Sequence, residues 1–266
     1  MTPVLCYHRI GGPLELGVTR VSPATFRRQM AALARAGWRT LTLAEYVDRL
    51  TRPASPVPGP ALLLTFDDGY AALARHAYPV LADLGLTAVT FLVTDYVGRT
   101  NAWDARYTWR RLPHLDWDTV VHWRARGFEF GSHGAAHRRL TWLEDAAVAD
   151  ELARSRATLT ARLGEDAGVA VAYPFGASAP RVGRLARAAG YRLGFAGVRG
   201  NAADPFDQPR VGVYVWDRFA PPLGLRNGVA GAVGRAAAHG ANRCSVGTSW
   251  ILRLLGSREP GAGSRH

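Results

Sequence analysis

The chain has 266 residues, 48% of them hydrophobic, so it is long enough for one large domain or two small ones with an ordinary buried core. Its formal net charge is +12, but the basic residues are all arginines scattered along the chain, so we do not expect a nucleic-acid-binding protein. The sequence has no run of about 20 apolar residues, which argues against a transmembrane helix.

The beginning of the sequence carries no recognisable export signal. Met1-Thr2-Pro3 leads directly into a strand-like apolar segment. If Met1 is the native start, we expect a cytoplasmic protein. If the native start lies upstream, we expect a secreted or cell-surface protein.

Strand-like and helix-like segments alternate along residues 4–213. Short apolar runs without polar alternation predict strands that are buried on both faces of a parallel sheet. We expect these strands over 4–8, 62–66, 88–93, 128–133, 169–173, 191–196 and 209–213, with a short extended piece at 41–43. Apolar residues at helical spacing predict helices over 23–36, 44–50, 70–84, 116–126, 142–163 and 180–189. This alternation predicts an α/β fold in which a parallel sheet closes, or nearly closes, into a barrel.

Three segments do not follow this alternation. The loop 94–116 is long and aromatic, and its Trp103 is expected either to stack on a sugar ring or to belong to a hydrophobic lid. Cys6 lies in the first strand-like run, far from Cys244, and is expected to be a small core residue rather than half of a disulfide. Residues 219–266 are rich in Ala, Gly and Arg, and we expect a poorly ordered tail with one helix near 250–255.

The motif Asp67-Asp68-Gly69 ends the predicted strand 62–66. Two adjacent carboxylates repel each other and resist burial, so they are a poor choice for stability alone. They suit a site in which a cation or an arginine lies between them, or in which one binds metal while the other moves protons. A turn with a solvated acid pair is the alternative.

Other polar residues also follow predicted strands. His8 ends the first strand and His133 the fourth, and α/β barrels build their sites at this rim. His137 is four residues after His133, and one helical turn would place both rings near one metal ion. With a carboxylate from Asp67 or Asp68 they would form a two-His, one-carboxylate set, which suits metal-assisted hydrolysis. The spacing does not decide which Asp is the ligand and which the base.

Three motifs resemble those of the polysaccharide deacetylases of carbohydrate esterase family 4, the NodB-homology group. They are Thr65-Phe66-Asp67-Asp68-Gly69, Ser132-His133-x3-His137-x2-Leu140 and Ala172-Tyr173-Pro174-Phe175-Gly176. The resemblance runs from about residue 3 to residue 216 and implies a distorted (β/α)7 TIM-like barrel over 1–218, followed by the tail 219–266. It implies an enzyme, expected to be a monomer, that removes N-acetyl groups from amino sugars in a polysaccharide or oligosaccharide.

The resemblance also implies roles for individual residues. Asp67 would be the general base, and Asp68, His133 and His137 would bind one divalent metal, zinc first, with cobalt, nickel or another divalent ion as alternatives. The third motif would line the substrate groove and offer a backbone N–H to the oxyanion. Its members here are Tyr173, Pro174, Phe175 and Gly176.

One departure from the family concerns the general acid. The usual C-terminal Leu-x-x-His motif is missing, and His239 lies in the Ala-rich tail without that context. Tyr7-His8-Arg9-Ile10, however, resembles the N-terminal Tyr-His motif of the poly-N-acetylglucosamine deacetylase subgroup, so we expect His8 to be the acid. A buried, purely structural Tyr-His pair is the alternative.

Two more departures concern the groups that support the site. Ala172 stands where the family has an arginine that steadies the base, and our hypothesis is that Arg210 supplies this charge to Asp67. Gly134 stands where Ser or Thr usually follows the first metal-binding histidine, which predicts a lost hydrogen bond and weaker metal binding. We expect the histidines outside the motifs to be surface or helix-face residues, namely His76, His114 and His122.

Two other functions remain open at this point. One is the same chemistry on a small soluble N-acyl amino sugar or antibiotic intermediate, which the missing export signal favours. The other is a glycan-binding protein with a decayed active site, which the substitutions Ala172 and Gly134 favour mildly.

Overall fold

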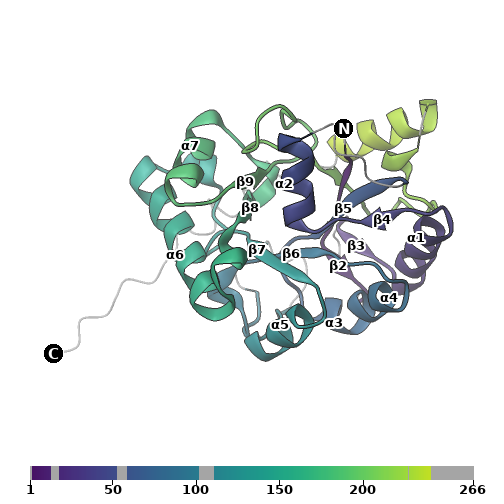
Figure 1. The fold of residues 1–266 in the computed structure, drawn as a ribbon, viewed down its shortest axis with the longest axis horizontal. Helices are drawn as coiled ribbons and strands as arrows, with labels where there is room; N and C mark the ends of the chain where they lie inside the picture. Colours follow the sequence, from purple (N-terminus) through teal and green to yellow (C-terminus); the bar gives the residue numbers. More distant parts are fainter. Residues whose placement is uncertain (1, 13–17, 53–58, 102–110, 227, 241–266) are drawn as a thin grey trace.

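The computed structural model describes residues 2–12, 18–52, 59–101, 111–226 and 228–240. Its centre is a curled parallel sheet surrounded by helices, as Figure 1 shows. The strands of this sheet are β1 (Val4–Tyr7), β5 (Ala61–Phe66), β6 (Val89–Leu92), β7 (Glu129–Ser132), β8 (Ala170–Ala172), β9 (Leu193–Phe195) and β10 (Val211–Gly212). The expected distorted (β/α)7 barrel is therefore confirmed.

The strand order is β10-β1-β5-β6-β7-β8-β9, and every neighbouring pair is parallel. The two ends of this path approach each other through Gln208, which forms a parallel bridge with Phe195 just before β10. β4 (Arg39–Thr40) pairs with the start of β5, and β2 (Arg9–Ile10) pairs with β3 (Arg20–Val21) in a separate two-stranded sheet. Because the strands run parallel, their carboxyl ends meet on one face of the barrel.

The sheet is buried on both faces, as the uninterrupted apolar runs predict. In β5, Leu62, Leu64 and Phe66 belong to one core cluster, whereas Leu63 belongs to another. Alternate residues of a strand point to opposite faces, so each face of β5 has its own core. The covering helices are α1 (Pro23–Arg35), α2 (Leu43–Thr51), α3 (Ala72–His76), α4 (Tyr78–Asp83), α5 (Trp117–Arg124), α6 (Asp145–Leu163) and α7 (Pro180–Ala188).

Two expected elements differ in the structure. The helix expected over 70–84 is divided into α3 and α4 at Ala77, because Pro79 has no N–H to donate to the preceding turn. The extended piece expected at 41–43 is instead β4, which ends at Thr40. Thr42 caps α2, since its side chain accepts from Glu45 N while the Glu45 carboxylate accepts from Thr42 N.

The segment after Phe219 also contains regular structure. A helix covers residues 228–240, and Arg199 Nε donates to Nε2 of His239 on it at 2.9 Å. The helix expected near 250–255 lies outside the described residues, as does Cys244. None of the helices in the described ranges is both long and apolar enough to span a lipid bilayer.

Candidate active site

Four strands bring polar side chains to one place. His8 follows β1, Asp67 and Asp68 follow β5, His133 follows β7, and Arg210 directly precedes β10. β1 lies between β5 and β10 in the sheet, so His8 at its end is beside the two acids, and the long side chain of Arg210 reaches Asp67 from the start of β10. The strand-end pattern therefore identified residues that meet in space.

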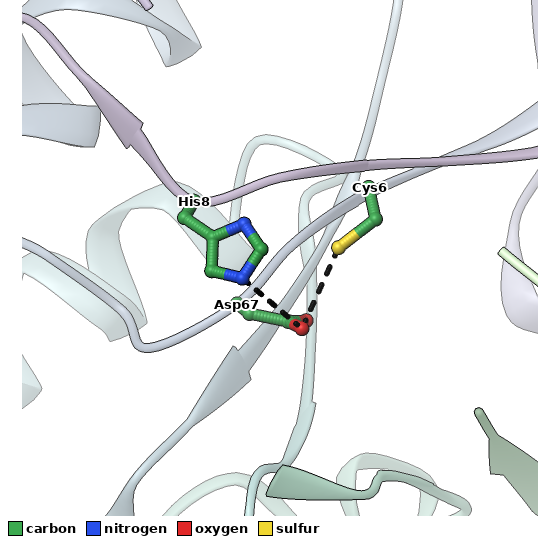
Figure 2. Close-up of side chains that lie close together, drawn as sticks. All are labelled: Cys6, His8 and Asp67. Carbon is green, nitrogen blue, oxygen red and sulfur yellow. Dashed lines mark hydrogen bonds and ion pairs between the residues drawn. The ribbon is translucent and has the colours of Figure 1, made fainter. Parts of the chain in front are cut away.

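Asp67 is the centre of the first group of contacts. His8 Nε2 lies 4.0 Å from Asp67 Oδ2, and the Cys6 thiol donates to the same oxygen at 3.5 Å (Figure 2). Tyr7, between them in the chain, points the other way and donates its hydroxyl to Gln29 Oε1 at 2.9 Å. Tyr7 is thus a core residue, whereas the His8 side chain is 23% exposed and faces the acid.

Cys6 is buried and free, as expected, but its contact with Asp67 was not foreseen. The signal was present in the sequence. Residues i and i+2 of a strand point to the same face, so Cys6 shares its face with His8.

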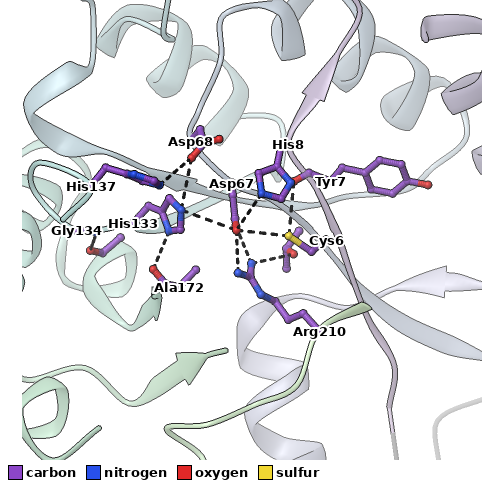
Figure 3. A network of polar contacts seen from close by, with 12 residues as sticks. Cys6, Tyr7, His8, Asp67, Asp68, His133, Gly134, His137, Ala172 and Arg210 are labelled. Atoms are coloured by element: carbon purple, nitrogen blue, oxygen red, sulfur yellow. Dashed lines mark hydrogen bonds and ion pairs between the residues drawn. The ribbon is translucent and has the colours of Figure 1, made fainter. Parts of the chain in front are cut away.

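Arg210 forms a two-pronged ion pair with Asp67 (Figure 3). Its two terminal nitrogens lie 2.6 and 2.8 Å from the two carboxylate oxygens, and its Nε donates to Ala196 O at 3.1 Å. Burial alone would raise the pKa of Asp67, but the charge of Arg210 and the nearby His133 and His8 outweigh burial and hold that pKa well below its usual range. Asp67 is therefore a carboxylate at neutral pH, and the contact hypothesised for Arg210 is present.

Asp68 faces a different set of side chains. Its Oδ1 lies 3.5 Å from His133 Nε2 and 3.4 Å from His137 Nε2, and all three residues are buried. Burial alone would raise the pKa of Asp68, but the hydrogen bond and charge of His137 outweigh burial, so the pKa is lowered overall. Burial lowers the pKa of His133 to about 4, so this imidazole is neutral at pH 7. Two imidazoles and one carboxylate converging on one point fit a divalent cation.

Hydrogen bonds from the surrounding backbone and side chains orient these groups. His133 Nδ1 lies 2.7 Å from Ala172 O, which leaves Nε2 directed at Asp68. Ala172, which replaces the family's arginine, thus contributes through its carbonyl. His114 Nδ1 lies 2.7 Å from Asp68 O, and burial lowers the pKa of this imidazole. The expectation that His114 is a surface or helix-face residue is wrong, because it is buried against Asp68. His122 is exposed on α5 as expected, and His76 is half-buried on α3.

His133 and His137 are brought together by a loop and not by a helical turn. No helix covers residues 133–137, and Gly134 has a φ of +80°. The loop is held by Glu151 of α6, whose carboxylate accepts from Ala135 N and Ala136 N at 2.9 and 3.0 Å. The helical-turn argument was therefore wrong although the proximity it predicted is present. The positive φ explains why position 134 is glycine, since a residue with Cβ is strained there.

Backbone strain is concentrated at this site. In the described part of the chain, three residues other than glycine have a positive φ, namely Asp68 (69°), His137 (58°) and Phe175 (62°). Such conformations cost about 1–3 kcal/mol each and persist where the surrounding structure imposes them. That two of them belong to the converging triad and the third contacts it is evidence for a functional site.

The third motif lies beside His137. The Phe175 ring is 4.8 Å from the His137 ring, centroid to centroid, and the Arg139 guanidinium lies over the same Phe175 ring, 5.7 Å from its centroid. Arg139 and Gly176 border a hollow of about 450 Å³ whose wall also includes Thr141, Ser178 and Arg199. Gly176 thus borders this hollow, and the neighbouring Phe175 contacts His137. Trp103 lies outside the described residues.

The side chain of Tyr173 does not line this hollow. Its ring is fully buried in the core, and its hydroxyl donates to Phe206 O at 2.9 Å. Its backbone N–H donates to Phe195 O, and that of Gly176 donates to Tyr173 O, each at 2.9 Å. Pro174 has no N–H. The prediction that the Tyr173 side chain binds substrate is therefore wrong. In this segment, the Phe175 N–H is the backbone amide that remains to donate to an oxyanion.

Comparison with known proteins agrees with this geometry. Residues 54–194 match the model of the family described as polysaccharide deacetylase. The chain belongs to the polysaccharide deacetylase family. It is 27% identical over 230 residues to YxkH of Bacillus subtilis (strain 168), which is provisionally named a polysaccharide deacetylase; the match covers 86% of this chain and 75% of YxkH.

Two solved structures extend the similarity to the polysaccharide deacetylase fold. IcaB from Ammonifex degensii superposes with a TM-score of 0.67 at 26% identity, covering 91% of this chain and 97% of that one. The Streptococcus pyogenes deacetylase PplD, solved in complex with acetate, superposes with a TM-score of 0.72 at 21% identity, covering 83% and 94%. The second likeness bears on the fold alone.

Proposed function

We propose that this polysaccharide deacetylase hydrolyses the N-acetyl groups of N-acetylglucosamine-type amino sugars in a polysaccharide or oligosaccharide. The observation that carries the proposal is the placement of two groups side by side. One group, Asp68, His133 and His137, fits a divalent cation, and the other, Asp67 and His8, is able to move protons.

The donor set supports a borderline metal such as zinc, because two imidazole nitrogens and one carboxylate leave positions open for water and substrate. When bound, the cation polarises the acetyl carbonyl and makes an attacking water more acidic. Zinc is our proposal for the metal, with cobalt, nickel and other divalent ions tested beside it.

The proton transfers are assigned to the chain's own residues. Asp67, kept ionised by Arg210, accepts the proton of the attacking water. The Phe175 N–H donates to the developing oxyanion. His8, on the other side of Asp67 and partly exposed, donates a proton to the leaving amine. The resemblance to the poly-N-acetylglucosamine deacetylases rests on Tyr7 and His8, and this resemblance favours a polymer substrate.

Acetate release from N-acetylglucosamine oligomers tests the proposal. Protein stripped with a chelator is assayed before and after zinc, cobalt or nickel is returned. Asp67→Asn and His8→Ala are each expected to lower kcat by about 10²- to 10⁴-fold while the metal remains bound. Full activity of His8→Ala would overturn the assignment of the acid.

The oligomer assay also separates the alternative functions. Activity on N-acetylglucosamine monomer or small N-acyl amino sugars, with none on oligomers, would identify a small-molecule deacylase. Protein that binds oligomers but retains no metal and releases no acetate would be a glycan-binding protein.

A further inference from the structure

A second cluster of metal-binding atoms lies next to the triad. Cys6 Sγ, a ring nitrogen of His8 and an oxygen of Asp67 all lie within 4.8 Å of one another, and Figure 2 shows the thiol and the imidazole approaching the same carboxylate. Two ligands of one tetrahedral ion lie about 3.5 Å apart. The distances to Asp67 Oδ2, 3.5 Å from the thiol and 4.0 Å from the imidazole, are close to that value.

We propose that Cys6, His8 and Asp67 form a second cation site, selective for thiophilic divalent ions such as Cd²⁺ and Zn²⁺ and weaker than the Asp68/His133/His137 site. The selectivity comes from sulfur, because a thiolate favours soft ions over Mg²⁺ or Mn²⁺. The triad has nitrogen and oxygen donors and does not discriminate in this way.

Two features make this second site the weaker one. The Cys6 thiol is buried and donates its proton to Asp67, so a bound ion must displace that proton, which leaves to solvent as the metal–sulfur bond forms. The guanidinium of Arg210, 2.8 Å from Asp67 Oδ2, also repels a cation placed there. Occupancy therefore requires metal in excess of what fills the triad.

An ion at this position would inhibit the enzyme. It would occupy the lone pair of Asp67 that accepts a proton and the His8 nitrogen that carries one. A single ion would thus block both proton-transfer groups while the triad stays loaded. The binding itself does not depend on the proposed deacetylation; only this inhibition rests on it.

The test is a Cd²⁺ titration of protein loaded with one equivalent of zinc, comparing wild type, Cys6→Ala and Cys244→Ala. The chain has two cysteines, so Cys244→Ala is the matched control for binding to the other thiol. Bound metal is counted after equilibrium dialysis, and the ultraviolet charge-transfer band of cadmium thiolate reports the sulfur ligand. Acetate release is recorded as a fraction of each variant's own metal-replete activity.

Wild type and Cys244→Ala are expected to bind a further equivalent of Cd²⁺, to show the thiolate band and to be inhibited. Cys6→Ala is expected to lack the band and to need at least about tenfold more Cd²⁺ for the same inhibition. Mn²⁺ at the same concentrations is expected to give no inhibition in any of the three proteins. If Cys6→Ala is unstable, Cys6→Ser is titrated in its place, because a serine hydroxyl does not replace the thiolate as a ligand of Cd²⁺.

A band and an inhibition curve that survive in Cys6→Ala, or that disappear in Cys244→Ala, would overturn the proposal. If no acetate release is detected with any metal, the proposed function fails, but the metal count and the thiolate band still decide this inference.

Discussion

Asp67 and Asp68 are adjacent in the chain, yet their carboxylates contact different side chains. Asp67 is paired with Arg210, and Asp68 is directed at His133 and His137. The left-handed backbone of Asp68 and of Gly69, both with a φ of 69°, turns the chain sharply at this point. A Cβ on Gly69 would also lie 2.6 Å from Leu92 Cδ2, so the turn requires glycine. The repulsion expected of two neighbouring acids is countered because Arg210 pairs with Asp67 while Asp68 faces two histidines.

Replacing Arg210 by Met should strongly destabilise the protein. The Asp67 carboxylate would remain buried without its counter-charge, and breaking such a pair costs about 3–5 kcal/mol. Urea denaturation measures this loss. The double variant Asp67→Asn/Arg210→Met should lose less stability than the sum of the two single variants, and strict additivity would show that the pair is not coupled.

Metal-free protein should lose stability as the pH falls from about 6.5 toward 4. An unfolded histidine has a pKa of about 6.5, whereas burial lowers that of folded His133 to about 4. Between these values the unfolded chain binds a proton that folded His133 does not, so unfolding becomes more favourable as acid is added. Chemical denaturation at pH 7 and pH 5 measures the effect.

The pH effect has a matched control among the histidines. His133→Gln should reduce the difference in stability between pH 7 and pH 5, whereas His122→Gln, at an exposed position on α5, should leave it unchanged. Equal behaviour of the two variants would contradict the assignment to His133.

Among the elements, α6 holds the loop that carries His133 and His137. Glu151 accepts hydrogen bonds from two consecutive amides of that loop, and the Ser155 hydroxyl lies 2.6 Å from that of Ser132, at the end of β7. A single face of one helix thus fixes the segment that carries His133 and His137. Without these contacts the strained backbone of Gly134 and His137 would relax.

Glu151→Ala should weaken metal binding by about 10- to 100-fold, because residues that orient ligands typically have effects of that size. Competition with a chromophoric chelator measures the affinity. Asp150→Ala is the matched control, since Asp150 is exposed on the same helix and pairs with Arg154 at 3.2 Å. A similar loss in both variants would mean that helix stability, rather than the loop contact, sets the affinity.

For the whole molecule, the two histidines and the carboxylate that we propose to bind metal come from two separate strands and the loop after one of them. An ion that binds only the assembled barrel stabilises it by mass action, by about 4 kcal/mol when its concentration is 1,000 times its Kd. Thermal unfolding in chelator and in excess zinc should therefore differ by several degrees. His137→Ala should reduce this difference, and an undiminished shift would place the stabilising ion elsewhere.

Much of the site could be predicted because it depends on local patterns. An apolar strand followed by a polar residue marks the rim of a barrel, and this located His8, Asp67, Asp68 and His133. Contacts that depend on tertiary packing were not predictable in the same way. His114 and Glu151 reach the site from a loop and a helix whose approach no local pattern specifies.

The strand order has a consequence for how the protein is made. Arg210 lies 143 residues after Asp67, and β1 is flanked in the sheet by β5 and by the late strand β10. During synthesis Asp67 emerges long before Arg210. β1 cannot pair with β10 until nearly all of the barrel has left the ribosome. Pairings of such high sequence separation form late and slowly. An incomplete chain therefore holds a carboxylate that resists burial, which should delay closure of the barrel until the last strand arrives.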